Sequence, residues 1–253
     1  MRTSGARSCA AAGHRASRWA VIFDWDGVIV DSSDAHRKSW ELLAAEEQRS
    51  LPPDHFQRGF GMKNPEIIRN LLKWTDDPVT IDRLSKRKEA LYRKIIANQG
   101  IRLVPGAGQL LDQLQAASVP MAIASSTDRA NITLIMERYL PHIRFSVIVA
   151  AEDVRRSKPE PDVFLTAARR LRIPPESCVV IEDAPAGIAA ARRARMKAIA
   201  VATTRRDEAL AAADLVVRDL AALDMQLLAS LASRAQPPGA APPPVDEARR
   251  YGP

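Results

Sequence analysis

Short apolar runs alternate with longer amphipathic segments along most of the chain. Six runs are almost wholly apolar and predict strands, at residues 19–23, 121–124, 145–151, 179–181, 198–202 and 215–217. Runs without a polar alternation are typical of strands that are buried on both faces, as in a parallel sheet. Helical patterns separate the later runs, at about residues 106–117, 128–139, 160–171 and 186–195. The alternation predicts an α/β fold with a doubly wound, Rossmann-like parallel sheet and right-handed crossovers.

The interval between the first and second predicted strands is far longer than one crossover helix. Residues 34–98 have a helical pattern and no convincing strand. We interpret them as a small α-helical cap domain that is inserted after strand 1, over the carboxyl ends of the strands, where such sheets bind ligands. The α/β core then consists of residues 19–33 and 99–233.

Composition and charge narrow the class of protein. Of 253 residues, 46% are hydrophobic and 26% are charged, which is ordinary for a protein with a buried core. No apolar stretch approaches the roughly 18 residues of a membrane span, so we expect no membrane partner. The net charge is +7, but residues 1–18 contribute +4 and residues 234–253 contribute +1. A nucleic-acid surface needs its basic excess on the folded part, so we expect no nucleic-acid partner either.

Both ends of the chain have the composition of tails. Residues 1–18 predict a disordered, basic extension, and residues 234–253 a Pro-rich, disordered tail. The first segment is rich in Arg, Ala and Ser and poor in acids, which is also typical of a transit peptide, so organellar targeting stays open. Cys9 and Cys178 cannot supply a disulfide framework. We therefore expect a reducing compartment, the cytoplasm. The sequence gives no sign of an obligate interface, so we expect a monomer.

Two acids follow the first predicted strand directly. Asp24 and Asp26 stand two residues apart near the strand end, so their side chains point the same way. Adjacent like charges are unfavourable unless one carries a proton or a cation neutralises them. Mg²⁺ prefers oxygen ligands, so the pair is a candidate Mg²⁺ site, although an ordinary acidic turn has the same sequence.

Polar residues also stand at other element ends of the predicted sheet. Ser125 and Ser126 follow one strand and lead into a helix, whose N-terminal amides can hold an anion. Glu182 and Asp183 end another strand, and Lys158 stands just before a helix. Because the carboxyl ends of parallel strands meet at one edge, these groups together predict a site for phosphate and Mg²⁺.

Four segments resemble the motifs of the haloacid dehalogenase superfamily. They are Asp24-x-Asp26-Gly27, Ala124-Ser125-Ser126, Ser157-Lys158-Pro-x-Pro-Asp162 and Ile181-Glu182-Asp183. The resemblance covers about residues 19–220 and is to the branch with a helical cap, which holds β-phosphoglucomutase and many small-molecule phosphatases. It implies a Rossmann-like core with a helical cap, and a small phosphorylated metabolite, such as a sugar phosphate, as the partner.

The resemblance implies catalytic and metal-binding roles for the acids. Asp24 would be the nucleophile that forms an aspartyl-phosphate, and Asp26 would serve as general acid and then general base. Mg²⁺ would be held by Asp24, the backbone carbonyl of Asp26 and Asp183, with Glu182 as an outer or variable ligand.

It also implies a phosphate site. Ser125, Ser126 and Lys158 would bind the phosphoryl oxygens, whose charge must be compensated during an in-line displacement. Gly27 would let the backbone approach that group closely, because it has no Cβ. With water as the acceptor, the resemblance implies a Mg²⁺-dependent phosphatase.

Candidate substrate residues lie in the predicted cap: His36, Lys63, Asn64 and Lys88. Lys88 interrupts an apolar stripe, where it either extends to solvent or meets an anion in the site. His36 is either a structural histidine or the counterpart of the histidine that positions the acid/base in the mutase. Lys88 resembles the second member of the mutase's cap Arg-Lys pair.

A phosphomutase is the main alternative to a phosphatase. β-Phosphoglucomutase holds the second phosphate of its sugar with a cap arginine, and the corresponding stretch here is Gly61-Met62-Lys63-Asn64. Lys63 is a point charge without the bidentate fork of arginine. Reorientation of a bisphosphorylated intermediate is therefore disfavoured, and we predict a phosphatase.

Two further functions are disfavoured by Asp26. Phosphonoacetaldehyde hydrolases use a cap lysine as a Schiff base, and Lys63 lies near that position, but those enzymes lack the second aspartate. A phospho-aspartate receiver transmits a signal instead of catalysing repeated turnover of a substrate. In such a receiver the acidic pair and the phosphate-accepting aspartate lie on different strands. Here Asp24 and Asp26 share one strand end. We therefore expect an enzyme.

One helix end departs from the family pattern. Arg195 stands where relatives usually have a glycine that closes the helix. A left-handed arginine would cost about 1 kcal/mol. We therefore expect this helix to end in a different shape.

Overall fold

Strands and helices alternate through the computed structural model, which describes residues 19–59, 61–204 and 207–233. The expected extension at residues 1–18 and the expected tail at residues 234–253 lie outside the described residues. No helix in the described ranges is both long and apolar enough to cross a membrane.

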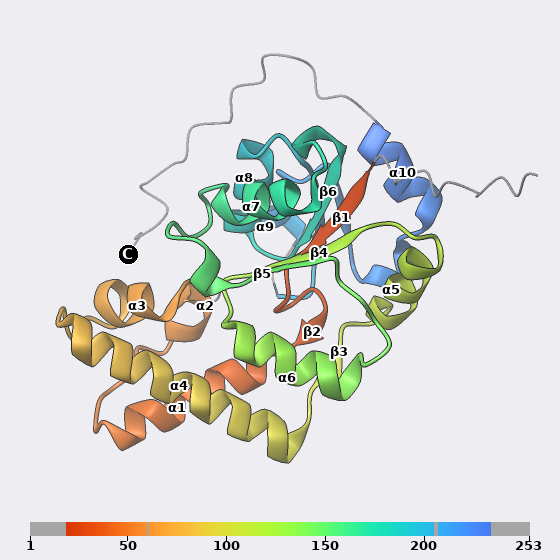
Figure 1. Cartoon of the computed structure of the whole chain (residues 1–253). Coiled ribbons are helices and arrows are strands. Elements are labelled where there is room, and N and C mark those ends of the chain that lie inside the picture. The colour runs from red at the N-terminus through yellow and green to blue at the C-terminus, as the bar shows by residue number, and fades with distance from the viewer. Residues whose placement is uncertain (1–18, 60, 205–206, 234–253) are drawn as a thin grey trace, which may run out of the picture.

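The main sheet is parallel and has six strands among the described residues. They are β1 (Ala20–Phe23), β4 (Met121–Ala124), β5 (Val147–Val149), β6 (Cys178–Glu182), β7 (Lys197–Val201) and β8 (Leu215–Val217). Their order is β5-β4-β1-β6-β7-β8, so the chain winds outward in both directions from β1 (Figure 1). The predicted α/β fold with a doubly wound sheet is confirmed.

Helices cover both faces of this sheet, which explains the unbroken apolar runs. Val21 and Phe23 of β1 face one layer, and Ala20 and Ile22 face the other. The first layer contains α5 (Ala107–Ala116), α6 (Arg129–Tyr139) and α10 (Met225–Ser233). The second contains α7 (Asp162–Leu171), α8 (Pro185–Arg193) and the short α9 (Asp207–Leu210).

The cap follows β1 and lies over the carboxyl ends of the strands (Figure 1). It contains α1 (Ser33–Glu46), α2 (His55–Gly59), α3 (Asn64–Glu66), a π-helical turn (Ile67–Leu71) and α4 (Pro78–Gln99). Helices α1 and α4 pack together around an apolar cluster that includes Trp40, Leu43 and Leu84. The domain boundaries at residues 34 and 98 stay a prediction.

Two short strands were missed by the sequence analysis. Strand β2 (Val30–Asp31) pairs antiparallel with β3 (Arg102–Leu103), with Val30 opposite Leu103. The pair joins the two connections between core and cap. A strand of two residues is too short to show an alternation of apolar and polar positions, so no pattern in the sequence could have indicated this pair of strands.

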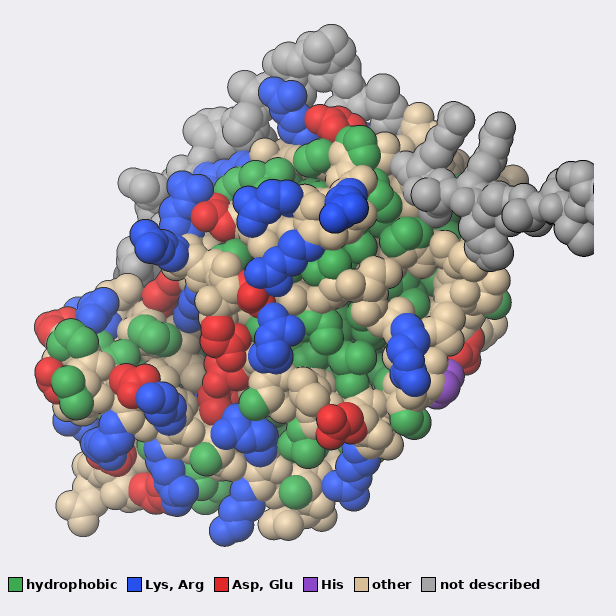
Figure 2. Space-filling view, in the orientation of Figure 1, with side chains coloured by type: hydrophobic (Ala, Val, Ile, Leu, Met, Phe, Trp, Pro, Cys, Tyr) green, Lys and Arg blue, Asp and Glu red, His purple; other side chains and the backbone are tan. Residues whose placement is uncertain are grey.

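Short 3₁₀ turns complete the described chain, at Ala151–Asp153, Pro175–Ser177 and Leu220–Ala222. On the face shown in Figure 2, the Lys and Arg side chains are scattered among acidic and apolar ones rather than gathered into one patch.

The end of α8 corrects the expectation for Arg195. Its φ is 60°, so it does adopt the left-handed conformation. The Met196 amide donates to the Ala191 carbonyl and the Arg195 amide to that of Arg192, the hydrogen-bond pattern of a Schellman motif. Satisfying these carbonyls requires a left-handed residue, whatever its side chain.

We expect Arg195→Gly to raise the free energy of unfolding by about 1 kcal/mol, because glycine adopts a positive φ without the steric cost of a Cβ. Denaturant unfolding measures the change. Arg169 of α7 is exposed and helical, so Arg169→Gly is the matched control and should instead destabilise by about 1 kcal/mol. Equal changes in the free energy of unfolding for the two variants would show that Arg195 is not strained.

Candidate active site

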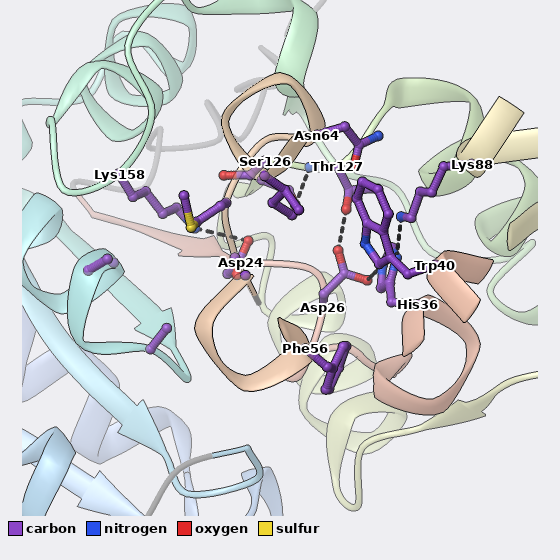
Figure 3. A pocket seen from close by; sticks show the side chains of 18 of the residues that line it. Asp24, Asp26, His36, Trp40, Phe56, Asn64, Lys88, Ser126, Thr127 and Lys158 are labelled. Atoms are coloured by element: carbon purple, nitrogen blue, oxygen red, sulfur yellow. Dashed lines mark hydrogen bonds and ion pairs between the residues drawn. The ribbon is translucent and has the colours of Figure 1, made fainter. Parts of the chain in front are cut away.

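A pocket lies at the carboxyl end of β1, where the winding direction of the sheet changes and the cap covers it. The core supplies Asp24, Asp26, Ser125, Ser126, Thr127, Lys158 and Glu182 to its lining. The cap supplies His36, Trp40, His55, Phe56, Asn64, Lys88 and Glu89, among others (Figure 3). The structure thus brings together most of the residues that the sequence analysis selected.

Asp24 is the first residue after β1 and is buried. Its amide donates to the Ile181 carbonyl of β6, which fixes the backbone across the two strands. Its carboxylate lies 3.0 Å from the Lys158 ammonium. Burial raises the pKa of Asp24 to about 7. The Lys158 charge lowers this pKa, whereas repulsion from Glu182 and Asp26 raises it further.

Three carboxylates gather at this point. Oxygen atoms of Asp24, Glu182 and Asp183 all lie within 4.8 Å of one another. Burial and the charges of Glu182 and Asp24 raise the pKa of Asp183 well above its usual value. Three buried acids face only one lysine, so ionising all three together is unfavourable unless a cation binds, and an oxygen-only donor set of this kind suits Mg²⁺.

The three carboxylates differ in how many of their oxygens are already hydrogen-bonded. Glu182 Oε1 accepts from Lys158, at 2.5 Å, and Oε2 accepts from the amides of Asp183 and Ala184, both at 2.8 Å. Both oxygens of Glu182 are therefore occupied, in keeping with an outer position. Asp183 Oδ2 accepts from the Thr204 hydroxyl.

Asp26 is oriented away from these acids and toward the cap (Figure 3). Its Oδ1 accepts from the Ser32 hydroxyl, at 2.6 Å, and lies 3.1 Å from His36 Nε2, whereas Oδ2 accepts from the Thr127 hydroxyl. Burial raises the pKa of Asp26, but its interaction with His36 and the hydrogen bonds from Ser32 and Thr127 lower it to about 2. Any metal contact of Asp26 would thus come from its backbone.

His36 is held between Asp26 and Lys88. Lys88 Nζ lies 2.7 Å from His36 Nδ1, and an ammonium can only donate, so Nδ1 accepts and Nε2 carries the proton toward Asp26. Tyr92 stacks on the imidazole with ring centroids 4.2 Å apart. Lys88 is 2% exposed and also donates to Glu89. It therefore does not extend to solvent.

The predicted phosphate residues occupy the core side. Ser125 is buried, its Oγ accepts from the Thr127 amide, and Ser126 lines the pocket. Lys158 is buried between Asp24 and Glu182, and although burial lowers its pKa, these two carboxylates raise it above the usual value. The lysine therefore keeps its charge inside the pocket.

Gly27 is not among the residues that line the pocket. Its φ is 77°, and a Cβ at this position would collide with the Asp183 carboxylate and with Thr204. The structure therefore gives another reason for this glycine than the expected approach to the phosphoryl group: it leaves room for Asp183.

Lys63 does not line the pocket either. Its ammonium donates to the backbone carbonyls of Ala151, at 2.8 Å, and Val154, at 2.6 Å, so it joins the cap to the core. Glu66 makes a second such contact, since it accepts from the Ser157 hydroxyl at 2.6 Å. Asn64 does line the pocket and donates to Glu89.

We expect Lys63→Met to weaken substrate binding through the cap, with KM raised about threefold to tenfold and kcat changed less, because only the cap–core hydrogen bonds are lost. Steady-state kinetics with p-nitrophenyl phosphate measures both constants. Lys73 lies in the same cap and is exposed, so Lys73→Met is the control and should leave KM unchanged. A loss of turnover in Lys63→Met would instead indicate a chemical role for this lysine.

Several site residues were not selected from the sequence: Ser32, Trp40, His55, Glu89 and Thr127. Thr127 follows the two selected serines directly, and Glu89 follows Lys88, so adjacency was the available signal. Ser32 lies 6 residues from Asp26 along the chain, whereas Thr127 lies 101 residues from it, so only the fold reveals that Thr127 contacts this carboxylate.

Comparisons with known proteins agree with this geometry. A family model described as "Hydrolase: haloacid dehalogenase-like hydrolase" matches residues 20–195. A chloroplastic 5-amino-6-(5-phospho-D-ribitylamino)uracil phosphatase from Arabidopsis thaliana is 39% identical over 83% of this chain, and the alignment spans 57% of that relative's length. The β-phosphoglucomutase of Bacillus subtilis is 35% identical, over 83% of this chain and 93% of its own.

A solved structure gives the same result. The crystal structure of β-phosphoglucomutase from Clostridium difficile superposes with a TM-score of 0.74 and 26% sequence identity, over 85% of this chain and 97% of that one. The family match covers most of the chain, and relatives of both kinds, phosphatase and phosphoglucomutase, are enzymes. The chain is an enzyme that belongs to the haloacid dehalogenase-like hydrolase family.

Proposed function

We propose that the protein is a Mg²⁺-dependent phosphatase that hydrolyses a small phosphorylated metabolite, such as a sugar phosphate, through an aspartyl-phosphate on Asp24. The observation that supports it best is the position of the Asp24 carboxylate, between the Lys158 ammonium and two further buried acids. A nucleophile beside a buried cation can meet a phosphate dianion without prohibitive repulsion. Phosphatases among the relatives support the same class of substrate.

Asp24 and Asp183 would hold Mg²⁺, together with the backbone carbonyl of Asp26, and Glu182 would stand behind them. When bound, the ion supplies positive charge to the phosphoryl oxygens. Lys158, Ser125 and Ser126 would bind the same oxygens from the other side. Together these groups offset the charge that keeps an anionic nucleophile away from a phosphate.

In the first step, a carboxylate oxygen of Asp24 attacks phosphorus and the bond to the leaving alkoxide breaks. Asp26 would protonate that oxygen as it leaves. Asp26 is held ionised here by its three hydrogen-bond donors, which is its proton-accepting state. The negative charge of an incoming phosphate raises the pKa of a neighbouring carboxyl, so substrate binding would prepare Asp26 to carry the proton.

In the second step, Asp26 takes a proton from water, which attacks the phosphorus of the aspartyl-phosphate and releases Asp24. His36 keeps the carboxylate in place through its Nε2–H, and Lys88 fixes that tautomer. The same carboxyl thus serves both half-reactions, in opposite directions.

The proposal is tested by phosphate release from p-nitrophenyl phosphate and a panel of sugar and polyol phosphates. We expect turnover with Mg²⁺ and a fall to below about one tenth after chelation, with recovery on adding Mg²⁺ back. Activity that a chelator leaves unchanged would exclude the metal, and no phosphate release from any ester would exclude the function.

A phosphomutase is the second candidate, favoured by the β-phosphoglucomutase relatives and by the His36–Lys88 contact. Against it, Asn64 stands in the stretch where the mutase has its arginine, and Lys63 is hydrogen-bonded to the core. Conversion of glucose 1-phosphate to glucose 6-phosphate, measured against phosphate release, separates the two.

Compartment and assembly belong to the same proposal. We infer a monomer in the cytoplasm, because its two cysteines favour a reducing compartment and the family is often monomeric. A chloroplastic relative supports the alternative that residues 1–18 direct the chain to an organelle. Localisation of the full chain fused to a fluorescent protein, with and without these residues, decides between them.

A further inference from the structure

One histidine in the cap half of the pocket has an unsatisfied ring nitrogen. His55, at the start of α2, lines the pocket and is 9% exposed. Its Nδ1 lies 2.8 Å from the Pro52 carbonyl, which can only accept, so Nδ1 carries the proton. Nε2 is then an acceptor in the uncharged ring, and it is buried with no partner among the described residues. A buried acceptor without a donor is costly, which points to a donor on a ligand.

The same half of the pocket contains a buried carboxylate. Glu89 is 5% exposed, lines the pocket, and accepts from Lys88, Asn64 and Asn131. Although burial raises the pKa of Glu89, the charge of Lys88 and the hydrogen bonds from Lys88 and Asn64 lower it to about 2. Glu89 is therefore an anion under all ordinary conditions.

The cations of the pocket are already paired. Among its described lining residues the permanent cations are Lys158 and Lys88, and no arginine is present. Lys158 faces Asp24 and Glu182, and Lys88 faces Glu89 at 2.8 Å. A second phosphate at the cap end would meet no unpaired lysine or arginine and would lie beside an anion.

Apolar side chains form the rest of this end. Trp40, Phe56, Met62 and Ile67 line it beside the polar groups. Aromatic faces and aliphatic walls suit the carbon skeleton of a metabolite, while a few fixed polar groups select its substituents.

We propose that the cap end of the pocket selects an uncharged, hydroxyl-bearing leaving group, with His55 Nε2 accepting a hydrogen bond from a substrate hydroxyl and Glu89 excluding a second phosphate. This deepens the proposed function and rests on it. The substrate class is a polyol or sugar monophosphate rather than a bisphosphate.

The first test needs no variant. We expect the protein to hydrolyse a hexitol monophosphate with a kcat/KM at least about tenfold above that for a hexose bisphosphate, because the bisphosphate must desolvate a second charged group beside Glu89. Equal or better use of the bisphosphate overturns the inference. No phosphate release from either ester, or from p-nitrophenyl phosphate, would instead remove the proposed function.

The second test isolates His55. Phenylalanine keeps a ring of similar size and lacks the acceptor, so His55→Phe is expected to lower the ratio of kcat/KM for the hexitol monophosphate to that for p-nitrophenyl phosphate by about tenfold. His142 is exposed and pairs with Asp112, so His142→Phe is the matched control and should leave this ratio unchanged. An unchanged ratio in His55→Phe overturns the role of its Nε2.

The third test isolates the charge of Glu89. Glu89→Gln keeps the size of the side chain and frees Lys88 from its ion pair, so the relative kcat/KM for the bisphosphate is expected to rise about tenfold. Thermal unfolding verifies that the variant is folded. A folded variant with the wild-type preference overturns the role of Glu89.

Discussion

Asp24→Asn is expected to lower kcat for every phosphate ester on the order of 10⁴-fold or more, because an amide cannot act as the nucleophile. The substitution keeps the size of the side chain, so substrate can still reach the site. Phosphate release with saturating Mg²⁺ measures the effect. A rate within tenfold of the wild type would remove Asp24 as the nucleophile.

The stability of the same variant supplies an independent readout. Burial and neighbouring acids raise the pKa of Asp24 to about 7. Above that pH Asp24 is ionised in the folded protein, and its charge destabilises the folded state. Without Mg²⁺ at pH 8, Asp24→Asn should therefore unfold at a higher temperature than the wild type. Asp112→Asn, at an exposed position, is the control and should change neither stability nor rate. A variant that is both inactive and unfolded would say nothing about chemistry, and the stability measurement excludes that case.

The sheet and the core half of the site could be predicted from the sequence because they are determined by local patterns. A strand that is buried on both faces needs an apolar run, as in residues 20–23, and its polar end must lie at the edge of the sheet. Asp24 and Asp183 therefore meet wherever β1 and β6 are adjacent, and these strands pair in register. Because β1 and β6 are parallel neighbours in one sheet, the meeting of their carboxyl ends could be predicted once the fold class was known.

The cap half of the site could not be predicted in the same way. The cap helices α1 and α4 pack together through their apolar faces and have other faces exposed to solvent, so a polar residue near the boundary of such a face is equally consistent with solvent, with the core and with the pocket. Lys63 and Lys88 illustrate the ambiguity: both were candidates for substrate contact, and one instead joins the cap to the core. Their positions depend on how the cap sits on the sheet, which no single helix determines.

Arg195 shows a different limit. The expectation of another helix end used the intrinsic cost of a left-handed arginine, which is about 1 kcal/mol. The observed Schellman bonds satisfy two carbonyls of α8 that would otherwise lack partners. Hydrogen bonds of this kind outweigh a local steric cost of that size, so local preference alone predicted the wrong conformation.

Asp26→Asn is expected to separate the two half-reactions, with a loss of about 10²-fold to 10⁴-fold in steady-state turnover. The amide has no proton to donate to the leaving oxygen and cannot accept one from water. For an alkyl phosphate both steps are slowed. For p-nitrophenyl phosphate the first step needs no acid, since p-nitrophenolate leaves unprotonated, and only the second is slowed.

Rapid mixing of Asp26→Asn with p-nitrophenyl phosphate should therefore give a burst of about one p-nitrophenol per protein, followed by slow release. The phosphoryl group stays on Asp24 during the slow phase, and mass spectrometry of the quenched protein would locate it there. Asp34→Asn, at an exposed position on α1, is the matched control and should turn over without a burst. The hydrogen bonds from Ser32, His36 and Thr127 all end on the Asp26 carboxylate. They hold this carboxylate in one orientation, which suits it to the proton transfer. A variant that turns over both esters at the wild-type rate would show that the proton moves by another route, and the assignment of Asp26 would be lost while that of Asp24 stands.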